Sequence, residues 1–261
     1  MFLSALTITS VGLTCKSFFN LGLASVSVSG LHHLSEALES EHRNHGRGIV
    51  TVCNHISTLD DPVTWGILPA RYYLKSRFTR WTLGASDIMF TNPVFSAFFR
   101  KGQVIETFRG KGIYQPAVET AIEKLNQGHW VHLFGEGKVN QPNTYLTDKH
   151  NRFILPRFKW GVGRILTSTK KPPVVIPMWI TGFDALMPEG RPFPYKFFPR
   201  LGTSLTVTFG KPLPPDAVAS IVDCLPAEEQ DPTKMLEREV FIRTQVTSMI
   251  HDAVESLGRS L

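Results

Sequence analysis

Cysteine is scarce in this sequence of 261 residues, and its placement excludes two classes of protein. The three cysteines, Cys15, Cys53 and Cys224, lie far apart, and no two of them form a CxxC pair. A small disulfide-stabilised scaffold needs an even, closely spaced set, and a structural zinc site needs paired ligands. The sequence therefore predicts neither, and it suits a compartment that does not require disulfides.

Charged residues are also few. They make up 19% of the chain, whereas an average soluble chain has roughly 25%. The hydrophobic fraction of 42% is enough for a packed core, which excludes an intrinsically disordered chain. The formal net charge of +6 favours polyanionic partners, namely nucleic acid, anionic lipid or a phosphate-bearing substrate. Charge alone does not choose among these three.

The first 35 residues contain a single charge, Lys16, and no acidic residue. The longer of their two uncharged runs covers residues 17–35, which is close to the roughly 20 apolar residues that a spanning helix needs. That run is interrupted by Ser, Asn, Gly and a pair of histidines. We therefore expect a membrane-associated segment over residues 1–35, with a helix that lies in the interface rather than across the bilayer. A buried core helix is the alternative.

Short β-rich runs alternate with helical patterns along the rest of the chain. Strands are expected over residues 49–53, 72–76, 103–108, 129–134, 174–180 and 203–209. Helices are expected over residues 62–68, 87–100, 114–127 and 157–169, and within residues 226–261 from near Pro232. This alternation predicts an α/β fold with a mixed, mostly parallel sheet flanked by helices. No linker divides the chain, so a single domain is expected.

Residues 54–61, with the sequence NHISTLDD, place His55 five residues before Asp60 and directly after an expected strand. On one continuous helix, five residues rotate by about 500°, which would leave the two side chains some 140° apart. At a strand-to-helix junction, the turn brings Asp60 back toward the strand. Histidine can remove a hydroxyl proton near neutral pH, and a carboxylate on its other nitrogen fixes the tautomer. The pattern fits two interpretations equally well: a catalytic pair of His55 and Asp60 with Asp61 as the helix cap, and a turn in which either aspartate merely caps the helix.

Two further patterns follow expected strands. Residues 134–140, with the sequence FGEGKVN, form a glycine-rich turn whose backbone N–H groups, together with Lys138, could bind phosphate. Its spacing is not that of a P-loop. Arg109 ends an earlier strand, where a guanidinium could hold a phosphodiester. An ordinary turn and a solvated surface arginine are the alternatives.

In their order along the chain, these patterns resemble the four sequence blocks of the glycerolipid acyltransferase superfamily. Those blocks are an NHxxxxD block, a glycine-to-arginine strand, an FPEG block and a proline-containing apolar strand. Residues 54–60, 102–109, 134–137 and 172–177 carry them here. Other segments are similar to the tafazzin branch of that superfamily, above all residues 157–164 with the sequence RFKWGVGR. The resemblance implies the superfamily fold, with residues 36–215 as the catalytic domain and residues 216–261 as a helical segment packed on it.

The resemblance also implies an activity. Tafazzins are CoA-independent phospholipid–lysophospholipid transacylases that remodel cardiolipin, and they sit at mitochondrial membranes facing the intermembrane space. Carried over, His55 is the general base and Asp60 orients it, with no metal and no cofactor. The same comparison assigns substrate binding to Arg109, Glu136, Gly137, Lys138 and Asn54. The superfamily usually has proline where this chain has Gly135, which leaves the position of the glutamate after it less certain.

Basic residues fit a lipid partner, because residues 149–171 contain seven Lys or Arg and no acid, and anionic lipid surfaces attract such clusters. The expected partners are phospholipid and lysophospholipid substrates, including cardiolipin and phosphatidylcholine, and an anionic membrane surface; a homo-oligomer is left open. Phe98 and Phe99 are expected in the membrane interface, in an acyl groove or in the core. Two alternatives remain: an acyl-CoA-dependent lysophospholipid acyltransferase and a non-catalytic scaffold that binds anionic lipid. Nucleic-acid binding is disfavoured because no recognition motif is present.

Overall fold

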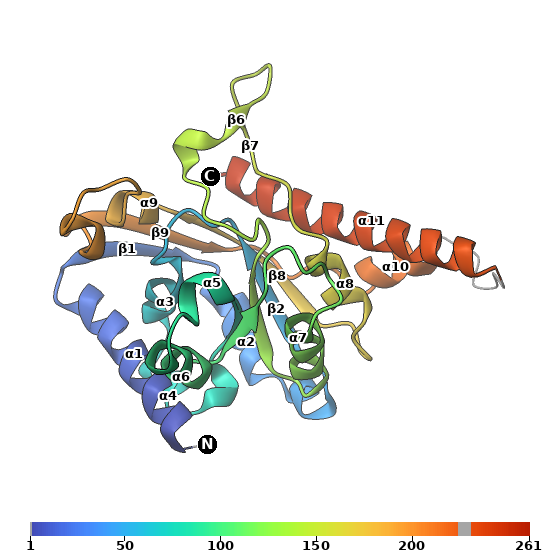
Figure 1. Ribbon diagram of the computed structural model, residues 1–261, viewed down its shortest axis with the longest axis horizontal. Helices are drawn as coiled ribbons and strands as arrows, with labels where there is room; N and C mark the ends of the chain where they lie inside the picture. The colour runs from blue at the N-terminus through green and yellow to red at the C-terminus, as the bar shows by residue number, and fades with distance from the viewer. Residues whose placement is uncertain (1, 224–230) are drawn as a thin grey trace.

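A central sheet organises the computed structural model, which describes residues 2–223 and 231–261 (Figure 1). Its strands are β1 (Ala24–Ser29), β2 (Ile49–Cys53), β3 (Trp81–Ala85), β4 (Val104–Thr107), β5 (Trp130–Phe134), β8 (Val174–Thr181) and β9 (Thr203–Phe209). They lie in the order β1-β9-β8-β2-β5-β3-β4, and of the pairs between these strands only β8–β9 is antiparallel. The predicted α/β fold with a mixed, mostly parallel sheet is therefore confirmed. Cys224 lies outside the described residues, whereas the helix expected from near Pro232 is present and begins at that residue.

Helices cover both faces of this sheet. The α-helices are α1 (Phe2–Asn20), α2 (Leu31–Glu39), α3 (Asp60–Val63), α4 (Ala70–Tyr73), α5 (Ser86–Met89), α6 (Pro93–Lys101), α7 (Pro116–Asn126), α8 (Gly161–Thr167), α9 (Phe183–Leu186), α10 (Ala217–Asp223) and α11 (Pro232–Arg259). Short 3-10 helices are η1 (Glu41–His45), η2 (Thr64–Ile67), η3 (Ser76–Phe78), η4 (Pro142–Thr144) and η5 (Tyr195–Phe197). A small hairpin of β6 (Leu146–Thr147) and β7 (Phe153–Ile154) projects away from the sheet (Figure 1).

Strand β2 is buried on both faces, which explains why its sequence is almost continuously apolar. Ile49 and Cys53 belong to a core that also contains residues of α1, α2 and α4. Val50 and Val52 belong to a second core, with residues of α7, α8 and α11. Figure 1 shows the two sets of helices on opposite sides of the sheet. The residues that follow β2 are thus held by a strand at the centre of both cores.

The first 35 residues are not a separate unit. Helix α1 buries Ile8 and Cys15 and leaves Leu3, Leu6 and Leu13 exposed. Residues 24–29, expected to be helical, form β1 instead, which pairs with β9 along its whole length. Its alternating serines suit an edge strand, because their hydroxyls can face solvent. Among the described residues, no helix combines the length and hydropathy needed to cross a bilayer.

Three other segments differ from the local structure expected of them. Residues 72–76 are not a strand, because Tyr72 and Tyr73 end the short helix α4 and bury their rings in the core. Residues 81–85, for which no strand was expected, form β3 between β5 and β4. The expected helix over 87–100 is divided into α5 and α6, and α6 begins at Pro93 with the Asn92 side chain as its cap.

Candidate active site

The candidate site lies where β2 and β5 end side by side. These strands are parallel and paired in register, with Cys53 opposite Phe134. The chain after each strand therefore emerges at the same edge of the sheet, where ligands of α/β proteins commonly bind. The first loop carries His55, and the second carries Glu136. Two motifs that are far apart in the sequence are brought together in this way.

His55 and Asp60 form the expected pair. The His55 Nδ1 atom lies 2.8 Å from the Asp60 Oδ2 atom. The same carboxylate oxygen accepts hydrogen bonds from the backbone N–H groups of Ile56, at 2.6 Å, and Ser57, at 2.8 Å. These bonds fold the loop around Asp60, which is fully buried. Burial raises the pKa of Asp60, and the hydrogen bond and charge of His55, with the two backbone N–H groups, oppose that rise.

The pair leaves one histidine nitrogen available for chemistry. Because Nδ1–H donates to the Asp60 carboxylate, the Nε2 lone pair is left to accept a proton. About 20% of the His55 side chain is exposed, so a ligand can reach it. The imidazole also stacks on Phe134, with ring centroids 4.0 Å apart and planes 20° apart. This contact fixes the plane of the ring, and the sequence patterns had not singled out Phe134 for such a role.

Glu136 holds the backbone of His55 in place. Its Oε1 atom accepts the His55 backbone N–H at 2.8 Å, and its Oε2 atom accepts the Asn140 side-chain amide. The Asn140 backbone N–H in turn donates to the His55 carbonyl at 2.7 Å, so the His55 residue is clamped at both its N–H and its carbonyl. Glu136 is buried, and both of its carboxylate oxygens are engaged. Glu136 therefore has a structural role in this site, and its expected contact with substrate stays a prediction.

The position of Glu136 predicts a pH-dependent stability. Burial raises the pKa of Glu136 to about 7 from its ordinary value of 4.5. The folded protein therefore binds this proton more tightly than the unfolded chain, and its free energy of unfolding falls as the pH rises from about 4.5 to about 7. Between about pH 5 and pH 8, wild type should lose about 2–3 kcal/mol more than Glu136→Gln does. Urea denaturation of both proteins at the two pH values measures the difference, and parallel pH profiles would contradict the assignment.

Asn54 is likewise a structural residue. Its side-chain amide donates to the Ile180 carbonyl at 2.9 Å, and its side-chain carbonyl accepts the Ile180 N–H at 2.9 Å. These two bonds tie the end of β2 to β8, and Asn54 is buried. Asn54 thus holds the loop that carries His55, and its expected role in substrate binding stays a prediction.

The other expected substrate contacts lie at different distances from the pair. Gly137 has a φ of 70° in the turn after β5, a conformation that favours glycine, and Lys138 is exposed beside it. Arg109 is exposed and pairs with Asp87 at 3.4 Å, just beyond the end of β4. Because β4 lies three strands from β2, the strand that leads to Arg109 is about 14 Å from the strand that carries His55. Lys138 therefore follows the strand next to β2, whereas Arg109 follows a strand at the far edge of the sheet and pairs with Asp87.

The neighbouring Phe158 ring explains why position 135 is a glycine. A Cβ atom at Gly135 would lie 2.4 Å from the buried Phe158 ring, so no side chain fits there. We expect Gly135→Ala to cost about 1–3 kcal/mol of stability, because it overpacks the core. Gly161→Ala is the matched control, since a Cβ at Gly161 meets nothing within 4 Å. Thermal and urea unfolding measure both, and the cost of Gly135→Ala should shrink in a Phe158→Leu background; an unchanged cost would contradict this explanation.

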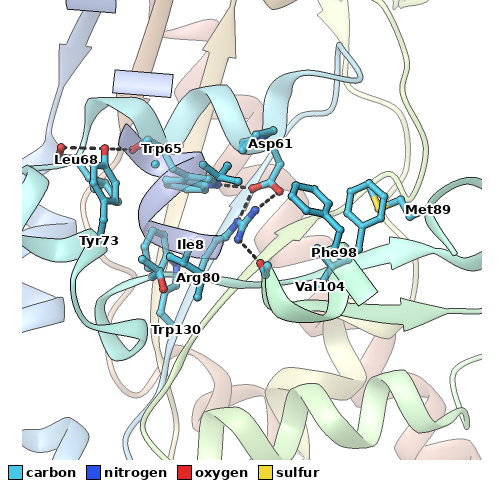
Figure 2. Close-up of a pocket in the computed structure, with 16 residues that line it drawn as sticks. Ile8, Asp61, Trp65, Leu68, Tyr73, Arg80, Met89, Phe98, Val104 and Trp130 are labelled. Atoms are coloured by element: carbon cyan, nitrogen blue, oxygen red, sulfur yellow. Dashed lines mark hydrogen bonds and ion pairs between the residues drawn. The ribbon is translucent and has the colours of Figure 1, made fainter. Parts of the chain in front are cut away.

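Asp61 is not the helix cap that the sequence suggested. Its carboxylate accepts hydrogen bonds from Arg80 Nε at 2.6 Å, from Arg80 Nη2 and from Trp65 Nε1 at 2.5 Å. Figure 2 shows Asp61 between these two side chains at the wall of a pocket. Arg80 and the hydrogen bonds hold the pKa of Asp61 below its usual value, against the opposing effect of burial. The ion pair thus ties Asp61, which directly follows Asp60, to Arg80 directly before β3.

The pocket beside Asp61 is mainly apolar. It has a volume of about 120 Å³, roughly ten times the minimum for one water molecule. Its lining includes Ile8, Val11, Trp65, Leu68, Tyr73, Met89, Phe98, Phe99, Val104 and Trp130 (Figure 2). Phe98 and Phe99 thus line this pocket, and their expected place in an acyl groove stays a prediction. The lining residues come from α1, η2, α4, α6 and neighbouring strands, so the N-terminal helix contributes directly to this cavity.

Comparison with known proteins agrees with this geometry. The Acyltransferase family model matches residues 26–181, more than half of the chain. A tafazzin of Dictyostelium discoideum is 37% identical over 223 residues, covering 84% of this chain and 72% of the relative. An N-acylphosphatidylethanolamine synthase of Arabidopsis thaliana is 38% identical over 182 residues, covering 70% of this chain and 60% of the relative.

A solved structure has a similar fold. The 1-acyl-sn-glycerophosphate acyltransferase of Thermotoga maritima superposes with a TM-score of 0.54 at 18% identity, covering 96% of this chain and 79% of the other. That likeness supports the fold alone, whereas the family model and the Dictyostelium relative establish the family. The chain therefore belongs to the acyltransferases and, within them, to the tafazzin family.

Proposed function

We propose that this protein transfers an acyl chain from a phospholipid to a lysophospholipid, with His55 as the general base. The observation that carries the proposal is the His55–Asp60 pair, with Nδ1 bound to a buried carboxylate and Nε2 left to accept a proton at an accessible strand edge. Such a pair suits direct attack of a hydroxyl on an ester. The family membership supports the same class of reaction.

The proton balance of this reaction needs no further group on the protein. The acceptor hydroxyl gives its proton to His55 Nε2 as its oxygen forms a bond to the carbonyl carbon of the donor ester. Collapse of the tetrahedral intermediate breaks the bond between that carbon and the donor's glycerol oxygen. His55 then returns the proton to that leaving oxygen, while Nδ1–H stays bound to Asp60. The group that leaves the donor is a glycerol hydroxyl, like the hydroxyl of the acceptor. The reverse reaction therefore uses the same residues.

The apolar pocket is proposed to hold part of a transferred acyl chain. It adjoins the reacting pair through Asp61, which lines the pocket and directly follows Asp60 (Figure 2). Burying each methylene group there contributes about 0.8 kcal/mol, so a modest length of chain adds useful binding energy. Trp65 lies between the pocket and the catalytic pair. Its ring packs against the His132 ring, which in turn packs against Phe134 beside His55.

Cardiolipin as a substrate, an anionic membrane surface and a mitochondrial location are parts of the same proposal. They follow from the tafazzin family; exposed apolar side chains, including Leu6 of α1 and Phe95 of α6, support the membrane surface alone. The loop before β9 adds Phe193, Tyr195, Phe197, Phe198 and Leu201. Fractionation of cells into mitochondrial and other membranes tests the location, and recovery of the protein in a different membrane would contradict it.

The identity of the acyl donor, phospholipid or acyl-CoA, is tested with purified protein in detergent. A phospholipid labelled in one acyl chain is supplied with an unlabelled lysophospholipid, with and without acyl-CoA. Transfer of label without CoA supports the transacylase. Transfer only from labelled acyl-CoA would assign the protein to the CoA-dependent alternative, and no transfer from either donor would favour a non-catalytic lipid scaffold.

The Arabidopsis relative supports a second candidate. Its name describes the synthesis of N-acylphosphatidylethanolamine, in which the acyl acceptor is an amine. A general base can remove a proton from an amine as it does from a hydroxyl. Supplying phosphatidylethanolamine beside the lysophospholipid decides between the two acceptors, since the products are an N-acylated lipid in one case and a diacyl phospholipid in the other.

A further inference from the structure

Residues 153–159 form a strap of non-helical chain that leads from the β6–β7 hairpin to the turn beside the catalytic pair. At the end of the strap, the Lys159 backbone N–H donates to the Gly135 carbonyl at 2.8 Å. The buried Phe158 ring packs on the same glycine, since a Cβ atom placed there would lie 2.4 Å from it. The next residue, Glu136, accepts the backbone N–H of the catalytic histidine at 2.8 Å. The strap therefore contacts the turn that holds this histidine in place.

The start of the strap is held by the C-terminal helix. Three side chains of α11 face it, and they are spaced four residues apart, which places them on one face of the helix: His251, Glu255 and Arg259. Glu255 Oε1 accepts the Leu155 backbone N–H at 2.9 Å, and His251 Nε2 donates to the Leu155 carbonyl at 2.9 Å. Arg259 Nη2 donates to the Phe153 carbonyl at 2.8 Å. Leu155 is buried, so its backbone groups need protein partners, and α11 supplies both of them.

His251 contacts both ends of the strap. Its ring packs edge-on against Phe158, with the ring centroids 5.1 Å apart and the planes at 80°. Phe158 therefore contacts both His251 and Gly135, and a single ring joins the helix to the turn. Burial raises the pKa of Glu136, and the charge of His251 is one of the effects that oppose this rise. The helix and the turn are thus coupled by packing and by electrostatics.

We propose that α11 positions the catalytic pair, with His251 and Glu255 as positioning residues that hold the strap on the turn. The proposal rests on the proposed function and assigns a role to a helix that lies outside residues 26–181, the segment that the family model matches. A strap that loosens releases the turn and, through Glu136, the backbone of His55. A displacement of about 1 Å at a reacting group costs about a hundredfold in rate. The loss should fall on turnover, because both residues act on the backbone of the site rather than on a bound lipid.

Steady-state kinetics of His251 variants test this role. His251→Leu removes the donor to the Leu155 carbonyl and should lower kcat about tenfold, with KM changed less than about twofold. His251→Gln keeps an N–H donor in the same place and should restore kcat to within about threefold of wild type. Gln245→Leu is the matched control, because Gln245 is exposed on the same helix. An equal fall in kcat for Gln245→Leu, a change in KM alone, or no rescue by His251→Gln would overturn the proposal.

Amide hydrogen exchange tests the positioning without any acyl transfer. The Lys159 N–H is bound to the Gly135 carbonyl, and the His55 N–H is bound to the Glu136 carboxylate. Both should exchange about tenfold faster in His251→Leu than in wild type, while amides within β2 and β5 keep their rates. This result supports the positioning role even in a protein that transfers no acyl chain. Equal exchange of the His55 amide in the two proteins, or faster exchange throughout the sheet, would overturn it.

A second pair of variants carries the same test where His251→Leu fails to fold. Glu255→Leu removes the acceptor of the Leu155 N–H, whereas Glu255→Gln keeps an oxygen in its place. Both variants lose the ion pair that Glu255 forms with Arg259 at 3.1 Å, so the difference between them isolates the bond to the strap. The proposal predicts a kcat about tenfold lower for Glu255→Leu than for Glu255→Gln. Equal kcat values for the two folded variants would overturn it.

Discussion

Replacing His55 with alanine is expected to lower acyl transfer by about three orders of magnitude without unfolding the protein. A positioned general base contributes about 10²–10⁴-fold to such reactions. His55 is partly exposed, so its removal leaves little empty space in the core. The measurement is kcat/KM for transfer to a lysophospholipid. His150→Ala is the matched control, since His150 is exposed on the β6–β7 hairpin and should be replaceable.

Asp60→Asn tests the second half of the pair. An amide cannot serve as the charged acceptor of the His55 Nδ1–H bond and of two backbone N–H groups at once. We expect activity to fall by about 10²–10⁴-fold while His55 remains in place. The melting temperatures of both variants serve as the check on folding. Activity within a few-fold of wild type in a folded Asp60→Asn protein would mean that Asp60 only shapes the loop.

Replacing Arg80 with methionine is expected to destabilise the protein by about 3–5 kcal/mol. The Arg80 and Asp61 side chains are each 11% exposed, so the change leaves a carboxylate buried without its charged partner. Arg80 also donates to the Gly102 carbonyl, and that contact is lost too. Urea denaturation measures the loss. Adding Asp61→Asn to Arg80→Met should recover part of it, because the unpaired charge is then removed.

The matched control is an exposed ion pair of the same type. The Arg71 and Glu39 side chains are 69% and 51% exposed. Arg71→Met should therefore cost less than about 1 kcal/mol. A cost for Arg80→Met no larger than that of Arg71→Met would contradict the role given to the buried pair.

Patterns in the sequence were most informative where a strand is buried on both faces. The continuous apolar run over residues 49–53 predicted β2, and the five-residue spacing of His55 and Asp60 predicted their contact. Strand β1 escaped prediction because it lies at the sheet edge and alternates serine with small apolar residues. Tyr72 and Tyr73 suggested a strand by their β propensity, although tertiary packing holds them in a helical turn.

The roles of polar residues around the site depended on contacts that no local pattern contains. Glu136 and Asn54 lie in recognisable motifs, but whether they face a ligand or the fold is decided by their hydrogen-bond partners. The proline after Asp61 favours a cap at that residue, whereas the actual partner of Asp61, Arg80, lies 19 residues further along. The segment before α8 contacts the turn after β5, where the Lys159 backbone N–H donates to the Gly135 carbonyl, and no local pattern predicts this contact.

Transfer of a labelled acyl chain between two phospholipids, without CoA, tests the central claim most directly. Wild type and His55→Ala are incubated with the labelled donor and an unlabelled lysophospholipid, and the label in the acceptor is followed over time. The His55–Asp60 account predicts steady transfer by wild type and a rate about a thousandfold lower for the variant. Equal rates for the two folded proteins would contradict it.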